Sequence, residues 1–84
     1  MPVLSRFYGI VIKMFLMNKE HNPPHIHAVY GEYVSLIDVT TGEVIEGDLP
    51  RKALGMVLEW VECNRDELIK IWNTQEFREL PPLV

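Results

Sequence analysis

The first half of the chain repeats apolar residues with a period of two, which predicts β-strands. We expect one long strand over Phe7–Met17, because all of its even-numbered positions are apolar and form one face. Several positions on its other face are apolar too, which is typical of a strand covered on both sides. Asn18–Pro24 is expected to be a loop, since Pro23 and Pro24 have no amide hydrogen to donate to a sheet.

Two shorter strands are expected next, over His25–Tyr30 and Tyr33–Val39. The two residues between them, Gly31-Glu32, predict a hairpin turn. A further turn at Thr41-Gly42 leads into a short fourth strand, Glu43–Glu46. Because short turns join these strands, we expect them to pair antiparallel.

The second half of the chain has the helical period. Apolar residues recur at i, i+3, i+4 and i+7 from Leu54 to Val61, and Pro50 suits the first turn of a helix. Asn64 followed by Glu67 has the spacing of a capping box, which predicts a second helix directly after Asn64. One helix with a kink at Asn64 is the alternative.

Strands that precede helices indicate an α+β fold. The predicted architecture is an antiparallel sheet of three to four strands, followed by two C-terminal helices packed on one face (ββββαα). We expect one domain over residues 1–84. It comprises a sheet in 7–47 with a histidine-rich loop at 21–27, a helical part in 50–77, and a tail, 78–84, whose Leu80, Leu83 and Val84 could pack back.

Size and composition narrow the class of protein. A chain of 84 residues with 48% hydrophobic and 24% charged residues is typical of one small globular domain. No apolar run approaches the roughly 18 residues of a membrane span. Cys63 is the only cysteine, which excludes a disulfide framework and favours a reducing compartment. We therefore expect a cytoplasmic protein with no membrane partner.

The net charge of −4 is distributed unevenly. Residues 1–20 contain three cations and one carboxylate, a net charge of +2, whereas residues 21–50 contain five carboxylates and no Lys or Arg. An acidic middle disfavours broad nucleic-acid binding, although a local site stays possible. All three histidines lie in this acidic stretch, so we expect carboxylates to raise their pKa values.

The segment His21–His27, which reads His-Asn-Pro-Pro-His-Ile-His, is the most unusual feature of the chain. On a strand, His25 and His27 point to the same face. Three hypotheses follow, of which the first is a zinc or other divalent-metal site with His21, His25 and His27 as ligands, completed by a carboxylate.

The second hypothesis is acid–base chemistry on a phosphoester. His25 and His27 would exchange a proton with the substrate, and Arg6 or Lys13 would hold its charge. The third is purely structural: His21 and His25 bond to backbone carbonyls and stabilise the loop, and Asn22 closes the turn.

Other polar side chains are candidates for contact with a ligand or partner. His21 and Asn22 lie in the loop, and Tyr30 and Tyr33 are expected to present hydroxyls beside the histidines, although sheet packing explains the tyrosines equally well. The two tryptophans, Trp60 and Trp72, lie at helical spacing among apolar residues and are expected in the core.

Several of these motifs together resemble family 4160 of the bacterial domains of unknown function. They are Ser5–Ile10 (Ser-Arg-Phe-Tyr-Gly-Ile), His21–Ala28, Tyr30–Tyr33 (Tyr-Gly-Glu-Tyr), Gly47–Pro50 (Gly-Asp-Leu-Pro) and the helix with Trp60. The resemblance covers nearly the whole chain, from about Met1 to Trp72.

The resemblance implies a small prokaryotic protein, often encoded beside a second small domain, family 2442 of unknown function. That arrangement looks like a two-gene toxin–antitoxin or regulatory pair. The expected function is therefore a protein-interaction module that binds the family 2442 protein through an exposed sheet edge or through the face of the histidine-rich loop. The alternatives are a histidine-dependent, ribonuclease-like toxin and a divalent-metal-binding domain.

Overall fold

The computed structural model describes residues 2–15 and 23–83. It contains one antiparallel sheet and one helix, with the bounds β1 Val3–Phe7, β2 Ile10–Lys13, β3 His25–Tyr30, β4 Tyr33–Asp38, β5 Val44–Gly47 and α1 Arg51–Thr74.

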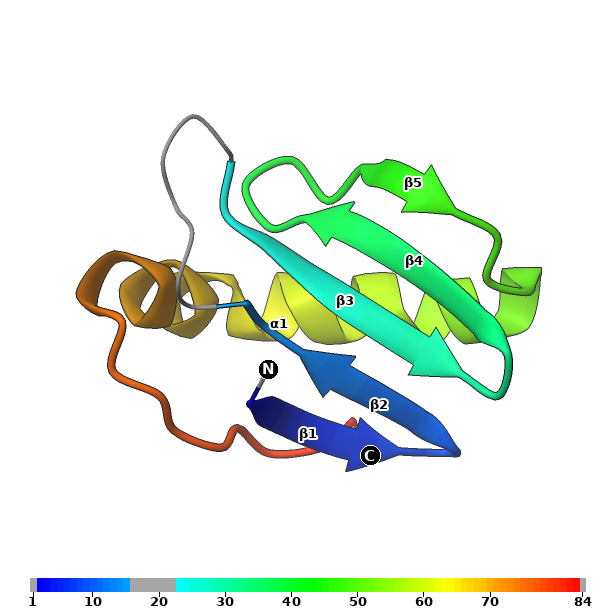
Figure 1. Cartoon of the computed structure of the whole chain (residues 1–84), viewed down its shortest axis with the longest axis horizontal. Helices are drawn as coiled ribbons and strands as arrows, with labels where there is room; N and C mark the ends of the chain where they lie inside the picture. The colour runs from blue at the N-terminus through cyan, green and yellow to red at the C-terminus, as the bar shows by residue number, and fades with distance from the viewer. Residues whose placement is uncertain (1, 16–22, 84) are drawn as a thin grey trace.

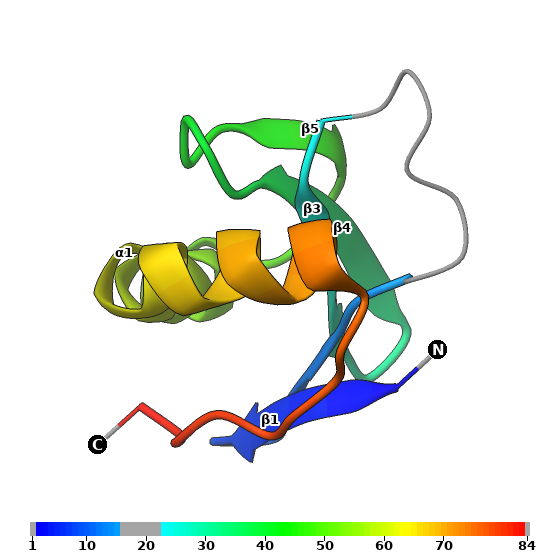
Figure 2. The same ribbon diagram turned by 90° about the vertical axis from the view of Figure 1, so that its left-hand side faces the viewer.

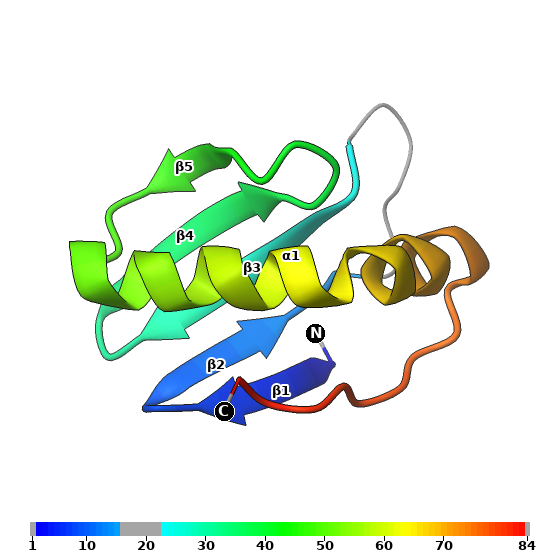
Figure 3. The ribbon, with the colours of Figure 1, turned by 180° about the vertical axis from the view of Figure 1, so that it is seen from behind.

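The strands lie in the sheet in chain order, β1-β2-β3-β4-β5, and each neighbouring pair is antiparallel (Figure 1). The helix α1 crosses one face of this sheet (Figure 3). The α+β class and the order of strands before helix confirm the prediction. The expected counts of three to four strands and two helices are wrong, because five strands and one helix are present among the described residues.

The predicted strand Phe7–Met17 is not one strand: its described residues, 7–15, contain the end of β1, a turn and the whole of β2. Tyr8 and Gly9 both have positive φ, 50° and 81°, and form a two-residue turn that pairs Phe7 with Ile10. A two-residue turn keeps Phe7 and Ile10 on the same face, and Tyr is uncommon at positive φ. The apolar pattern therefore hides the turn, and the sheet begins at Val3 rather than at Phe7.

The predicted break at Asn64 is absent. The Asn64 side chain donates from Nδ2 to the carbonyl oxygen of Trp60, 2.9 Å away and four residues earlier, so it does not cap a new helix. The helix continues to Thr74, although its axis bends between the yellow and orange parts of the ribbon (Figures 1 and 2). It ends where Gln75 adopts a left-handed conformation, with φ of 61°, and donates its amide to Ile71.

The core lies between the sheet and the helix. Alternate residues of β2, β3 and β4 are fully buried against α1, as the period of two requires. Trp60 and Trp72 are buried in the core, which confirms that prediction. The Trp60 ring packs against Phe7 of β1, with 5.9 Å between ring centroids.

The tail after α1 runs back along β1 (Figures 1 and 3). The amide of Leu80 donates to the carbonyl oxygen of Leu4 at 2.8 Å, and Nε1 of Trp60 donates to the carbonyl oxygen of Pro81 at 2.8 Å. Leu80 is only 6% exposed and Leu83 is partly buried against the core, so both pack back as predicted, whereas Val84 lies outside the described residues. This tail covers the outer edge of β1.

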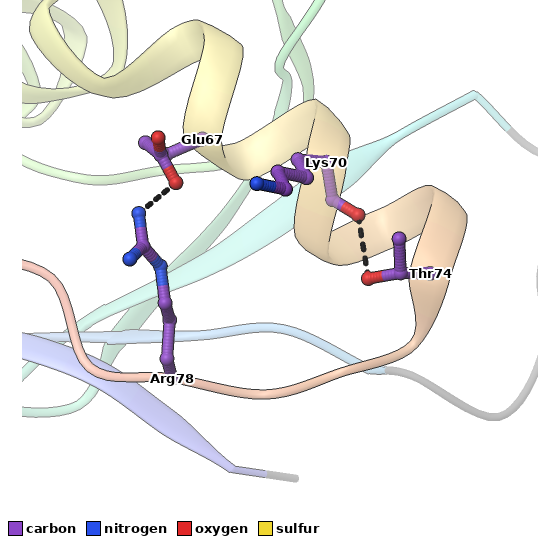
Figure 4. A network of polar contacts seen from close by, with 4 residues as sticks. All are labelled: Glu67, Lys70, Thr74 and Arg78. Carbon is purple, nitrogen blue, oxygen red and sulfur yellow. Dashed lines mark hydrogen bonds and ion pairs between the residues drawn. The ribbon is translucent and has the colours of Figure 1, made fainter.

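An ion pair also joins the tail to the helix. The guanidinium of Arg78 pairs with the carboxylate of Glu67 (Figure 4). In the last turn, Thr74 donates its hydroxyl to the carbonyl oxygen of Lys70 at 2.8 Å. Because Arg78 and Glu67 are exposed, this pair contributes little stability, and the buried Leu80 is the main anchor of the tail.

Candidate functional site

His25 and His27 share one face of β3, as predicted. Their ring centroids are 5.5 Å apart. The intervening Ile26 is fully buried on the opposite face, against the helix. The histidines therefore lie on the face of the sheet that the first turns of α1 do not cover, which we call the open face.

The backbone and the end of the helix hold His25 in place. Its Nδ1 donates to the carbonyl oxygen of Pro23 at 2.9 Å, which leaves Nε2 as the acceptor of the neutral ring. The last turns of α1 curve round the end of the sheet (Figure 2), and the Trp72 ring lies 5.1 Å from the His25 ring. Trp72 is 3% exposed, so it is a rigid wall for this ring. The structure thus contains the bond to a backbone carbonyl that the structural hypothesis expects for His25.

His27 has a different environment. Its cross-strand neighbour is Lys13, and its Nδ1 is buried with no hydrogen-bond partner among the described residues. Burial lowers the pKa of His27 below 6.5, and the nearby His25 and Lys13 lower it further. The expectation that carboxylates raise this pKa is wrong for His27, because burial disfavours the charged ring and its neighbours are His25 and Lys13 instead of carboxylates. His27 is neutral at pH 7.

The strand register brings Arg6 and Lys13 to the same open face. Arg6 pairs with Val11, two residues before Lys13, and Lys13 pairs with His27. Side chains at these positions alternate with the buried Ile10 and Ile12, so they point away from the helix. The four residues that sequence reasoning chose for catalysis, Arg6, Lys13, His25 and His27, thus share one face.

A metal site is incomplete in the described part of the chain. Residues 2–15 and 23–83 hold no group of three or more His, Cys, Asp or Glu side chains arranged for a metal ion. Asp38 lies opposite His25, but its Oδ1 accepts the amides of Thr40 and Thr41. His21 and Asn22 lie outside the described residues, so the zinc site of His21, His25 and His27 stays a prediction.

Tyr30 and Tyr33 do not lie beside the histidines. They pair with each other next to the turn that joins β3 and β4, at the opposite end of β3 from His25. Tyr30 also points to the opposite face, because it follows His25 by an odd number of residues. The tyrosines and the histidines therefore belong to two separate places.

Sequence reasoning did not single out the outer edge of β5. No described segment pairs with that edge, and all four residues of β5 are exposed. Val44 and Ile45 are 40% and 50% exposed, and Glu43, Glu46 and Asp48 flank them. The alternation pattern of the sequence does not reveal that these two adjacent aliphatic residues are both exposed.

No helix in this fold is both long and apolar enough to cross a membrane. This holds for the chain as far as the structure describes it.

Comparison with known proteins identifies a family whose description assigns no function. Searches of curated proteins and of solved structures return no match. A family model described as a domain of unknown function matches residues 9–73, which include His25, His27 and most of α1. Residues 5–8 of the first motif precede the matched range. Because the match covers more than half of the chain, the protein belongs to the DUF4160 family.

Proposed function

We propose that this chain is a protein-interaction module, one half of a two-gene regulatory or toxin–antitoxin-like pair, which binds its partner by strand addition at β5. The supporting observation is the unequal state of the two sheet edges. The tail covers β1, whereas in the described chain nothing covers the backbone of β5. An uncovered edge presents unpaired N–H and C=O groups, which a partner strand can satisfy.

The negative charge around β5 indicates which kind of partner strand fits this edge. Glu43, Glu46 and Asp48 surround the exposed Val44 and Ile45, and neither β4 nor β5 contains a Lys or Arg. A second copy of β5 would bring carboxylates together, which disfavours pairing of the chain with itself at this edge. The proposed partner therefore presents a strand with aliphatic and basic side chains. We propose the neighbouring family 2442 protein in this role.

Co-expression with that protein tests the proposal. The two chains should co-purify at micromolar concentration, and Ile45→Lys should abolish co-purification, since a lysine on an edge strand opposes pairing and repels a basic partner. Phe77→Lys is the matched control, because Phe77 is 43% exposed on the tail, away from β5. Separate elution of the wild-type chains, or equal loss of binding in both variants, would contradict the proposal.

A second candidate function is acid–base catalysis on a phosphoester, as in a ribonuclease-like toxin. It is favoured by the open face, where a neutral His27 lies beside His25, Lys13 and, one strand further, Arg6. Neutral His27 suits a general base, and the cations suit a phosphate.

Expression in a bacterial host tests the second candidate. Growth arrest should disappear in a folded double variant, His25→Ala with His27→Ala. Arrest that persists in the double variant excludes these histidines from the mechanism. The Ile45→Lys variant should keep the arrest, which separates the two functions.

A further inference from the structure

A cavity of about 440 Å³ lies between the β1–β2 turn and the start of α1. It is lined by Tyr8, Tyr30, Pro50, Lys52, Ala53 and Met56. It is distinct from the open face and from the β5 edge, and neither candidate function uses it. Its size falls within the usual range of small-molecule sites, about 300–1,000 Å³.

Two aromatic rings form one wall. Tyr8 is 63% exposed. It occupies a turn position whose positive φ disfavours Tyr and favours Gly or Asn. The turn therefore presents a large ring to solvent instead of the small residue that suits the backbone. The Tyr30 ring lies against Gly9, where an added Cβ would be 3.4 Å from Cε1 of Tyr30. That distance is an ordinary van der Waals contact, so the Tyr30 ring packs directly against the turn.

The opposite wall combines apolar contact with positive charge. Ala53 and Met56 belong to the first two turns of α1, and Lys52 lies beside them. The first turn contains Arg51 and Lys52 but no acidic residue, and no side chain caps the amides that follow Pro50. Unpaired amides and the helix dipole favour a negative charge at this position, as do the two cations.

We propose that this cavity binds a small, free, planar aromatic carboxylate. The aromatic body lies against Tyr8 and Tyr30 and over Met56, and the carboxylate faces Lys52 at the start of α1. The two walls thus require an apolar plane and an anion in one molecule, which neither an aliphatic acid nor a neutral aromatic compound provides.

Titration with 1-naphthoate tests the proposal on the full chain labelled at the methionine methyl groups. The Met56 methyl resonance should shift and saturate with a Kd of about 1 mM, the value expected for a ligand of this size. The Met14 methyl, fully buried in the core, serves as the internal control and should not shift. The neutral isostere 1-naphthamide should bind several-fold more weakly.

Two variants remove one wall each. Tyr8→Asn should weaken 1-naphthoate binding about fivefold without unfolding the chain, since Asn tolerates the positive φ. Lys52→Gln should weaken 1-naphthoate about threefold and leave 1-naphthamide unchanged, which is the scale of an exposed charge pair. Lys70→Gln, on the same helix and exposed, is the control for charge and should change neither.

Four results would overturn the proposal. The first is an unchanged Met56 resonance at 10 mM 1-naphthoate, about ten times the expected Kd. The second is equal affinity for the acid and the amide, and the third is equal binding by Tyr8→Asn. The fourth is evidence for another occupant. A Met56 shift that depends on protein concentration alone would assign the cavity to a second copy. Tighter binding of acetyl-Gly-Gly-Phe than of 1-naphthoate would assign it to the C-terminus of a partner protein.

Discussion

The two halves of the sheet differ in both charge and closure. The half formed by β1–β3 contains Arg6 and Lys13 and no carboxylate, and the tail covers its outer edge. The half formed by β4 and β5 contains Asp38 and Glu46 and no Lys or Arg, and its outer edge is uncovered in the described chain. One edge is therefore satisfied within the chain, whereas no described segment pairs with the backbone groups of the other.

The largest expected effect is at the junction of β5 with β4. Gly47 has φ of 118°, and a Cβ there would overlap with the carbonyl oxygen of Val34 and with Ser35. The buried Ser35 hydroxyl also accepts the amide of Leu49 at 3.0 Å, so a shift of Ser35 breaks that bond. Gly47→Ala should cost about 3 kcal/mol of unfolding free energy in urea denaturation, through strain and the lost bond.

Gly31→Ala is the matched control for Gly47→Ala. Gly31 also has positive φ, 61°, but nothing lies within 4 Å of an added Cβ, so only the backbone cost of about 1 kcal/mol applies. Equal losses in the two variants would show that the close approach of β5 to β4 is unimportant, and that the open edge is not held rigidly.

The next effect compares the two edges directly. Leu80→Ala removes a buried side chain from the tail and should lower the free energy of unfolding by about 2–3 kcal/mol. Ile45→Ala on β5 should change it by less than about 0.5 kcal/mol, because Ile45 is half exposed. Urea denaturation measures both. Comparable losses would remove the distinction between a closed and an open edge.

The smallest effect concerns the charge of the β1–β3 half. Because the pKa of His27 is lowered in the fold, the unfolded chain binds more protons than the folded chain below about pH 6.5. The free energy of unfolding should therefore decrease as the pH falls from about 6.5 through the pKa of His27 in the folded chain. Lys13→Gln removes one cause and should raise the pKa of His27 towards its ordinary value, which makes the decrease shallower.

An NMR titration of the His27 ring measures this pKa, and denaturation at pH 5 and pH 7 measures the linkage. His27→Gln is the control, since it removes the titrating group and should flatten the pH dependence. A His27 pKa at or above 6.5 would contradict the cationic surroundings inferred for this half of the sheet.

Local patterns predicted much of the fold. The β3–β4 hairpin, the start of α1 and the core tryptophans follow from periodicity and turn chemistry within short segments. Local patterns did not predict the turn at Tyr8 and Gly9, because a two-residue turn preserves the apolar face and this one places an aromatic residue at positive φ. Asn64 misled for a related reason: its side chain bonds within the helix to Trp60, and spacing alone does not distinguish that bond from a cap.

The sequence by itself determined the antiparallel α+β class, because strand and helix periods and short turns are local patterns. It also determined the shared face of His25 and His27, because side chains alternate along a single strand. Tertiary structure alone decided that Lys13 lies beside His27, that Trp72 lies against His25, and that the tail closes β1 while no described segment covers β5. Those contacts join residues far apart in the chain. Strand register and the bend of α1 determine them, and no local pattern encodes either.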